Sequence, residues 1–241
     1  MNWKLWAPWY RKIVGRLNID EKADNLSARA LNLLLPEPKI DELRAVLNGR
    51  ECVVFGAGPS LDEDLAKLSL SGRLEKILIS ADGATTAVLK YKTPDVVVTD
   101  LDGNIDDQLK AWRRGAWLVV HAHGDNMQEI EKVVPLVKER IIGTTQIKPF
   151  ERLFNFGGFT DGDRAAFMAH ELGASKIYLA GMDLGEKIGK HSGKKDMTRK
   201  RVKLEICKEL LAWLALKSSL VNLTSHGEPI PDVRSEERMV R

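Results

Sequence analysis

The chain has 241 residues, 44% of them hydrophobic, which is enough for one large domain with a sizeable core. Its 37 basic and 34 acidic residues leave a formal net charge of +3, a balance that argues against a nucleic acid as the main partner. No apolar run is long enough for a membrane span, and the N-terminus lacks the apolar core of a signal peptide, so we expect a cytoplasmic protein without stable membrane insertion. The two cysteines, Cys52 and Cys207, fall in a predicted strand and a predicted helix, which favours buried thiols over a disulfide.

Residues 1–48 carry no strand signal and are expected to form an N-terminal helical segment. Trp3, Trp6, Trp9 and Tyr10 recur there at roughly helical spacing among basic residues. Three interpretations stay open for these aromatic residues: packing on the core, a place on a membrane surface, or a contact in a homodimer. Packing is the favoured interpretation, because aromatic residues near a terminus are more often structural than lipid-binding.

From residue 49 to about 225, short apolar runs alternate with helical patterns, which predicts an α/β domain with a mostly parallel sheet and helices on both faces. Strands are expected at residues 52–55, 76–80, 96–98, 116–120, 140–142, 176–180 and 220–223. A long amphipathic helix is expected over 198–217, and residues 144–155 are expected to form a loop. The remaining residues, 226–241, are charged and are expected to form a loosely held C-terminal tail.

Aspartates follow several of these strands where each leaves the sheet. Asp100 and Asp102 follow three consecutive valines, Asp82 follows the preceding strand, and Asp183 follows a later one. The carboxyl ends of parallel strands border the crevice where ligands bind. Residues two apart lie on the same side if strand geometry persists, so Asp100 and Asp102 would be suited to joint coordination of Mg²⁺. Converging carboxylates repel one another and require a cation, and magnesium in turn indicates a phosphate ligand.

Glycine-rich turns accompany the aspartates. Gly56 and Gly58 connect the first strand to a helix, and this turn is either an ordinary tight turn or a phosphate-binding loop. Ser60 and Glu63 are predicted to form a capping box at that helix. A second such turn, Gly157-Gly158, precedes a helix that Thr160 or Asp161 would cap.

Further polar side chains follow the fourth predicted strand, where His121, His123 and Asp125 are candidate ligands. The run over 187–203, which includes Lys194, is rich in Lys and Arg. It is either a solvated loop or a flap that closes basic groups over phosphates. The sequence contains neither a P-loop motif nor the protein kinase signature set.

The combination of motifs resembles a known family. The segments that carry the resemblance are Gly56-Ala57-Gly58-Pro59-Ser60-Leu61, Ala81-Asp82-Gly83, Thr99-Asp100-Leu101-Asp102-Gly103, the run from Asn155 to Arg164, and Gly181-Met182-Asp183. In this order, over roughly residues 50–220, they resemble the archaeal-type 6-hydroxymethyl-7,8-dihydropterin pyrophosphokinases, a group related to proteins associated with flagellin glycosylation. The aspartate elements also resemble the metal-binding part of thiamine pyrophosphokinases, which implies a fold like their catalytic domain.

The resemblance implies Mg²⁺-dependent transfer of pyrophosphate from ATP to a reduced pterin, with release of AMP, in folate or methanopterin biosynthesis. It implies metal binding by Asp82, Asp100 and Asp102, and catalysis by Asp100, Asp102 and Asp161. The residues expected at the nucleotide and its phosphates are Gly56, Gly58, Ser60, Gly83, His121, His123, Asp125, Gly157, Gly158, Thr160 and Lys194. Phe159 and Asp183 are the candidates for contact with the pterin. The acceptor of the substrate's hydroxyl proton stays open among Asp125, His123 and bulk water.

Three other functions are alternatives to this one. Thiamine pyrophosphokinase shares the reaction and differs in a substrate that the motifs do not determine. The stretch from Val96 to Asn104 also imitates the nucleophile loop of haloacid dehalogenase-type phosphatases, but that family carries Thr where Asn104 stands and places the loop on its first strand. A non-enzymatic nucleotide-binding module would not need so many carboxylates that could bind a metal.

Overall fold

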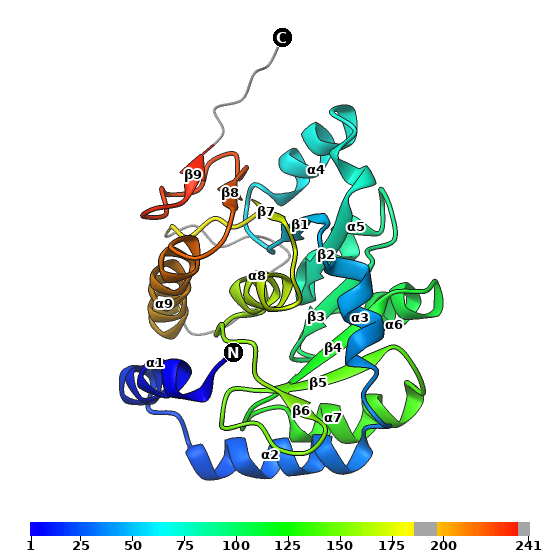
Figure 1. The fold of residues 1–241 in the computed structure, drawn as a ribbon, viewed down its shortest axis with the longest axis vertical. Helices are drawn as coiled ribbons and strands as arrows, with labels where there is room; N and C mark the ends of the chain where they lie inside the picture. The colour runs from blue at the N-terminus through cyan, green and yellow to red at the C-terminus, as the bar shows by residue number, and fades with distance from the viewer. Residues whose placement is uncertain (186–196, 236–241) are drawn as a thin grey trace.

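The computed structural model describes residues 1–185 and 197–235. Within these residues, nine strands pair in parallel in a single sheet of order β6-β5-β4-β3-β2-β1-β7-β8-β9 (Figure 1). The strands are β1 (Glu51–Phe55), β2 (Ile77–Ala81), β3 (Val96–Thr99), β4 (Trp117–Ala122), β5 (Ile141–Thr145), β6 (Leu153–Phe154), β7 (Lys176–Ala180), β8 (Leu220–Asn222) and β9 (Arg234–Ser235). The predicted parallel α/β class is confirmed.

The α-helices of the described residues are α1 (Trp3–Leu17), α2 (Glu21–Leu34), α3 (Ile40–Leu47), α4 (Leu61–Leu70), α5 (Thr85–Val88), α6 (Ile105–Arg113), α7 (Met127–Val133), α8 (Asp161–Glu171) and α9 (Met197–Ala215). Short 3-10 turns lie at η1 (Arg73–Glu75), η2 (Asp82–Ala84) and η3 (Val134–Leu136). None of these helices is both long and apolar enough to cross a membrane.

Helices cover both faces of the sheet, as alternate side chains of β1 show. Val53 and Phe55 belong to a hydrophobic cluster with residues of α4 and α5. Cys52 and Val54 belong to a larger cluster on the other face, which includes residues of α1, α2, α8 and α9. Because successive side chains of a strand point to opposite faces, both faces of this strand are buried and its sequence is apolar throughout.

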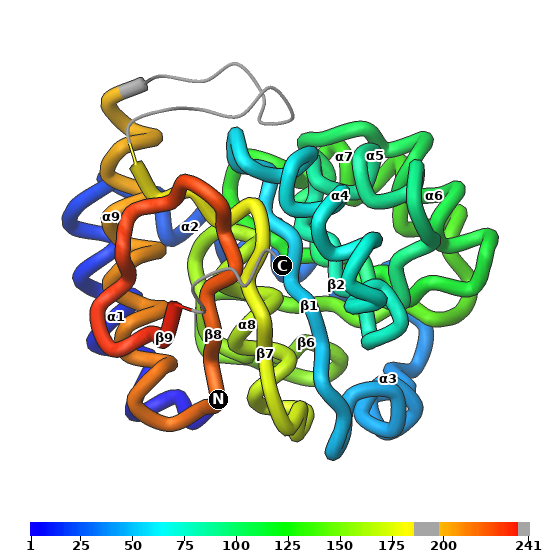
Figure 2. Tube along the Cα trace, turned by 90° about the horizontal axis from the view of Figure 1, so that it is seen from above, coloured from blue at the N-terminus to red at the C-terminus, as the bar shows by residue number. Residues whose placement is uncertain are grey.

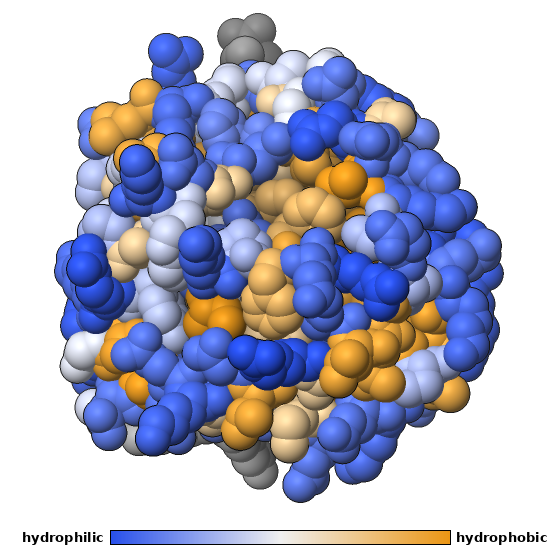
Figure 3. All heavy atoms as spheres, turned by 60° about the horizontal axis from the view of Figure 1, so that its bottom comes forward, coloured by the Kyte–Doolittle hydropathy of each residue, from blue (hydrophilic) through white to orange (hydrophobic). Residues whose placement is uncertain are grey.

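The N-terminal helices pack on the core, as the favoured interpretation predicted. Trp6, Tyr10, Ile13 and Leu17 form the buried stripe of α1, which lies beside α9 (Figure 1). The surface of the molecule that comes into view when the bottom of Figure 1 is turned forward carries both hydrophobic patches and hydrophilic side chains (Figure 3).

The order of the strands reverses at β1. The chain adds β2 to β6 on one side of β1 and then returns through α8 to place β7 on the other side, so that β7 and β1 run side by side (Figure 2). The loops that follow β1 and β7 are therefore neighbours at the carboxyl ends of the strands. Such a reversal point is where open parallel sheets bind their ligands.

Two sequence-based expectations about elements were wrong. The loop expected over 144–155 contains the end of β5 and all of β6. The tail is not wholly loose, since β9 pairs with β8 and both Ile230 and Val233 are buried.

Candidate active site

A cavity of about 1160 Å³ opens at the carboxyl ends of the strands. Its walls come from the loops after β1, β2, β3, β4 and β7 and from the first turns of α8 and α9. Most of the residues predicted from the strand ends therefore do meet in one place. This position at the reversal point follows from the strand order and not from any single motif.

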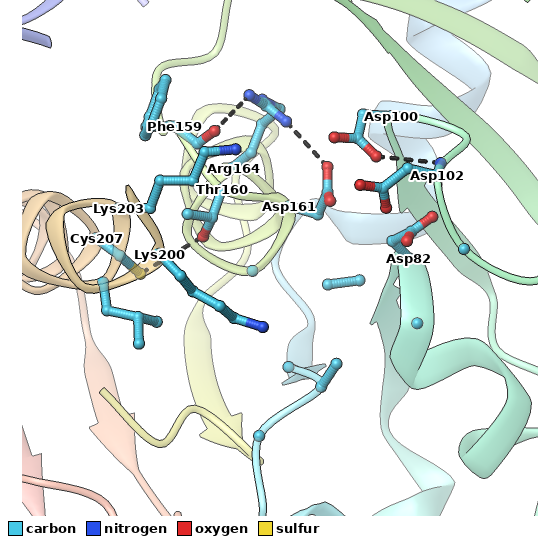
Figure 4. Close-up of a pocket in the computed structure, with 18 of the residues that line it drawn as sticks. Asp82, Asp100, Asp102, Phe159, Thr160, Asp161, Arg164, Lys200, Lys203 and Cys207 are labelled. Atoms are coloured by element: carbon cyan, nitrogen blue, oxygen red, sulfur yellow. Dashed lines mark hydrogen bonds and ion pairs between the residues drawn. The ribbon is translucent and has the colours of Figure 1, made fainter. Parts of the chain in front are cut away.

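Three carboxylates converge inside this cavity. Asp82, Asp100 and Asp161 each offer one carboxylate oxygen, and these atoms lie within 4.8 Å of one another (Figure 4). The set combines two residues predicted as metal ligands with Asp161, which was predicted as catalytic. Asp102, the third predicted ligand, also lines the cavity but does not belong to this group of three.

The three carboxylates interact electrostatically. Burial, followed by the charge of Asp100, raises the pKa of Asp161 well above its usual range, and Arg164 opposes this shift. Arg164 donates from Nη1 to Asp161 Oδ1 at 2.9 Å and from Nη2 to the carbonyl of Phe159 at 2.7 Å (Figure 4). Three converging carboxylate oxygens are hard ligands, so the site is suited to a divalent cation with oxygen ligands.

Neighbouring residues hold the carboxylate of Asp82 in place. Thr99 Oγ1 and Gln108 Nε2 both donate to Asp82 Oδ1, at 2.5 and 2.7 Å. A Cβ atom on Gly103 would lie 2.5 Å from Asp82 Oδ2, so only glycine leaves room for this carboxylate. These two buried hydrogen bonds to Oδ1 hold the carboxylate of Asp82 in position.

The geometry expected of Asp100 and Asp102 was wrong in detail. The strand ends at Thr99, and Leu101 takes a left-handed φ of 66°, so the alternation of a strand does not extend through the two aspartates. A turn brings them together instead, with the backbone N–H of Asp102 3.3 Å from Asp100 Oδ1 and the N–H of Leu101 donating to Thr99 Oγ1. Buried Leu101 anchors the turn in the core.

His123 contacts the carboxylate group through Asp100. Its Nε2 lies 3.2 Å from Asp100 Oδ2, and its Nδ1 accepts the backbone N–H of Asp125 at 3.2 Å. With Nδ1 acting as an acceptor, the proton of the neutral ring resides on Nε2, which donates to Asp100. Asn126 fixes the same turn by donating to the carbonyls of Asp100 and His121, each at 2.7 Å.

His121 does not line the cavity, although the strand-end argument selected it. The fourth strand runs two residues further than expected, to Ala122, so His121 lies inside β4 and is buried. Its Nδ1 lies 3.1 Å from Thr144 Oγ1. Burial and the nearby Arg164 hold the pKa of His121 well below its ordinary value, which keeps the ring neutral.

The glycines of the first turn serve close packing between the loops after β1 and β7. The N–H of Gly56 donates to Ala180 O at 2.9 Å and that of Gly58 to Gly181 O at 2.8 Å. A Cβ on Gly56 would lie 2.7 Å from Gly181 O, and one on Gly58 would lie 2.5 Å from the same atom. These N–H groups already have backbone acceptors, so the tight-turn interpretation accounts for both glycines.

The predicted capping box of Ser60 and Glu63 was wrong. Ser60 uses its hydroxyl and its N–H on the two carboxylate oxygens of Asp183, at 2.5 and 3.0 Å, while Glu63 pairs with Lys67 and His226. Asp183 lines the cavity, as its predicted contact with a pterin requires, but both its oxygens already accept from Ser60.

The second glycine turn shapes the start of α8. Gly157 and Gly158 take φ values of 87° and 83°, and neither lines the cavity. Thr160 is the N-cap of α8 and forms a capping box with Asp163, whose carboxylate also accepts the N–H of Phe159 at 2.8 Å. Asp163 is therefore structural. Thr160 and Phe159 line the cavity, as does Gly83 of η2.

The positive wall of the cavity comes from α9. Arg199, Lys200 and Lys203 line it, and the Nζ of Lys203 lies 5.8 Å from the ring centroid of Phe159 (Figure 4). These three residues belong to the basic run over 187–203 that was predicted to face phosphates, whereas Lys194, the residue named from that run, lies outside the described residues. The missed signal was periodicity, because the lining residues Lys200, Lys203, Leu204 and Cys207 recur at the i, i+3, i+4, i+7 spacing of one helix face.

Comparisons with known proteins point to one family. A model of the family described as 6-hydroxymethylpterin diphosphokinase MptE-like matches residues 27–189. Three curated proteins named 6-hydroxymethyl-7,8-dihydropterin pyrophosphokinase are similar over most of their length. The protein of Pyrococcus furiosus is 45% identical over 226 residues, 89% of this chain and 94% of its own. Those of Methanothermobacter thermautotrophicus and Methanocaldococcus jannaschii are 43% and 38% identical, again over 89% of this chain and over 95% and 96% of theirs.

The family match covers β1 to β7 and the strand ends among them that line the cavity. These identities over nearly whole chains confirm the family that the shared motifs predicted. The chain is an enzyme that belongs to the MptE-like family of 6-hydroxymethylpterin diphosphokinases.

Proposed function

We propose that this enzyme transfers pyrophosphate from ATP to the hydroxymethyl group of 6-hydroxymethyl-7,8-dihydropterin in an Mg²⁺-dependent reaction that releases AMP. The names of the three relatives support the pterin and the reaction type. The observation that carries the role of metal and phosphate is the pairing of three converging carboxylates with a basic helix face inside one cavity.

The residues fit a divalent cation. Asp82, Asp100 and Asp161 would hold it through their carboxylate oxygens, with Asp102 close by on the same loop as Asp100. A bound Mg²⁺ would offset the negative charge of the phosphate oxygens. The carboxylates themselves need such a cation, because burial and mutual repulsion raise the free energy of the ionised set.

The basic face of α9 supplies the second half of the proposed phosphate site. Arg199, Lys200 and Lys203 would bind phosphate oxygens that point away from the carboxylates. Held between two walls of opposite charge, the triphosphate would present its β-phosphorus to the substrate hydroxyl. Positioning and charge neutralisation are the main sources of catalysis in such transfers.

In the reaction, the hydroxyl oxygen of the pterin forms a bond to the β-phosphorus while the bond between that phosphorus and the oxygen bridging to the α-phosphate breaks. The β- and γ-phosphoryl groups leave ATP together, AMP departs, and the hydroxyl proton is released. Phe159 offers an aromatic face for the planar pterin at the cavity wall. Asp125 also lines this cavity and remains a candidate to accept the proton.

The activity can be measured with ATP, Mg²⁺ and a panel of acceptors, namely 6-hydroxymethyl-7,8-dihydropterin, thiamine and simple phosphomonoesters. We expect AMP and the pterin diphosphate in equal amounts. Thiamine diphosphate as the preferred product would reassign the substrate, and release of inorganic phosphate from monoesters without ATP would replace the proposal with a phosphatase.

The carboxylates are tested one at a time in the same assay. Asp100→Asn and Asp161→Asn should each lower turnover by about 100-fold or more while the protein stays folded. Asp41→Asn is the matched control, since Asp41 lies on α3 with 95% of its side chain exposed. Near-normal turnover in either cavity variant would remove that residue from the proposed metal site.

A further inference from the structure

A buried carboxylate outside the cavity connects the N-terminal helices to the carboxylate group. Asp24 of α2 is 1% exposed and accepts three hydrogen bonds. Tyr10 Oη and Gln146 Nε2 donate to its Oδ2 at 2.9 and 2.6 Å, and the backbone N–H of Gly124 donates to its Oδ1 at 2.9 Å. All three donors are neutral groups. The carboxylate is the acceptor for all three donors, so its loss would leave the N–H of Gly124 without this partner.

The bond to Gly124 reaches the cavity in two further steps. Gly124 lies between His123 and Asp125, which line the cavity. The N–H of Asp125 donates to His123 Nδ1, and His123 Nε2 contacts Asp100 Oδ2. The turn that orients the imidazole is therefore held in place from α2, on the side away from the cavity.

Steric contact fixes the same turn. A Cβ on Gly124 would lie 2.8 Å from the Cβ of Ala23, while every other neighbouring atom would be at least 3.5 Å away. The backbone of Gly124 does not take a positive φ, so the lack of a side chain is required by this close approach alone. Helix α2 therefore holds the turn in two ways: Asp24 accepts a hydrogen bond from the Gly124 N–H, and Ala23 packs directly against Gly124.

We infer that Asp24 is a positioning residue for the carboxylate group, acting through Gly124 and His123 to hold Asp100 in the geometry that a cation requires. This inference rests on the proposed metal site. It gives the N-terminal helices a part in the reaction although they contribute no residue to the cavity lining described above. Metal ligands are sensitive to such support, because outer partners of a ligand typically change metal affinity by about 10–100-fold.

The direct test measures binding of Mn²⁺, in the presence of the non-hydrolysable analogue α,β-methylene-ATP, by electron paramagnetic resonance. Gly124→Ala should weaken Mn²⁺ binding about tenfold, because the new methyl group pushes the turn away from Ala23. Adding Ala23→Gly to this variant removes the opposing methyl and should restore the affinity. Asp24→Ala, which removes the acceptor of the Gly124 N–H, should weaken binding to a similar extent.

Two further variants separate positioning from stability. Tyr10→Phe removes a hydrogen bond to the same carboxylate but leaves the bond to Gly124, so it should lower the unfolding temperature and leave Mn²⁺ affinity unchanged. His123→Ala should weaken Mn²⁺ binding, and adding Asp24→Ala should cause little further loss, because both changes interrupt one chain of contacts.

The outcomes are distinguishable. Absence of Mn²⁺ binding to the wild-type protein would overturn the proposed metal site itself. Normal Mn²⁺ affinity in both Gly124→Ala and Asp24→Ala, with the wild type binding, would overturn the inference alone. Additive losses from Asp24→Ala and His123→Ala, or failure of Ala23→Gly to restore Gly124→Ala, would also contradict it.

Discussion

Gly56 shows how a residue that resembles part of a ligand loop can be required for packing. Its N–H is bonded to Ala180 O, and a side chain there would meet Met182 and the carbonyl of Gly181. The carbonyl belongs to the backbone of the neighbouring loop and cannot move without displacing the residues that follow β7. The glycine therefore sets how closely the two halves of the sheet meet at the cavity.

We expect Gly56→Ala to lower the free energy of unfolding by about 1–3 kcal/mol through overpacking. Gly15→Ala is the matched control, because Gly15 lies in α1 with no atom within 4 Å of its Cβ position, and the change should instead raise stability by up to about 1 kcal/mol. Urea denaturation of both variants measures the difference. Equal stability of Gly56→Ala and wild type would show that the loops after β1 and β7 separate easily.

His121 should make the stability of the fold depend on pH. Its pKa is held well below the ordinary 6.5 by burial, so below pH 6.5 the unfolded chain binds a proton that the folded chain does not. The free energy of unfolding should therefore fall as the pH drops from 7.5 to 5.5. In the His121→Asn variant, the free energy of unfolding should fall less steeply over the same range. The measurement is urea denaturation at both pH values, and parallel losses in the two proteins would contradict the assignment.

At the scale of elements, α9 brings the basic wall to the cavity. Along the sequence, the residues of α9 that line the cavity are separated by exposed residues and by residues that face the core. For this reason the local sequence looks like a run of charges and not like one helix face. The helix itself was predicted within two residues of its bounds, Met197–Ala215. Which of its faces meets the carboxylates depends on packing against α8 and α1, which no local pattern reports.

Lys200→Gln should raise the KM for ATP by about tenfold, because a charge-assisted contact to phosphate is worth on the order of 1.4 kcal/mol more than a neutral one. Lys208→Gln is the control on the same helix, where Lys208 pairs with Glu228 at 2.9 Å outside the cavity. Steady-state kinetics at saturating pterin compare the two. An unchanged KM for Lys200→Gln, with kcat also unchanged, would remove this residue from the phosphate site.

Strand positions were predictable where apolar runs are bounded by polar or turn residues. Lys176–Ala180 was predicted at its observed bounds because Gly181 ends the run. The end of β4 was misplaced because His121 is polar, although burial inside a parallel sheet leaves it in the strand. There His121 Nδ1 lies 3.1 Å from Thr144 Oγ1 across β4 and β5, a contact between residues distant in sequence.

At the scale of the whole molecule, the order of the strands in the sheet could not be predicted from the sequence. Asp82 and Asp100 were predictable as strand-end residues, and Asp161 was singled out as well. Their convergence depends on α8 crossing from β6 back to β7 over β1, β2 and β3. The supporting contact from Asp24 to Gly124 spans 100 residues and leaves no periodic trace in the sequence.

The outermost strand on one side of the sheet, β6, is only two residues long, and β9 on the other side has two residues within the described part of the chain. An edge strand presents unpaired backbone groups that another chain could pair with, and very short edges are one way in which natural proteins limit this hazard. A sheet whose central strands are almost entirely apolar would otherwise be a template for aggregation. The brevity of β6 therefore limits pairing with another chain at that edge of the sheet, and we expect association between copies there to use helical surfaces instead of extending the sheet.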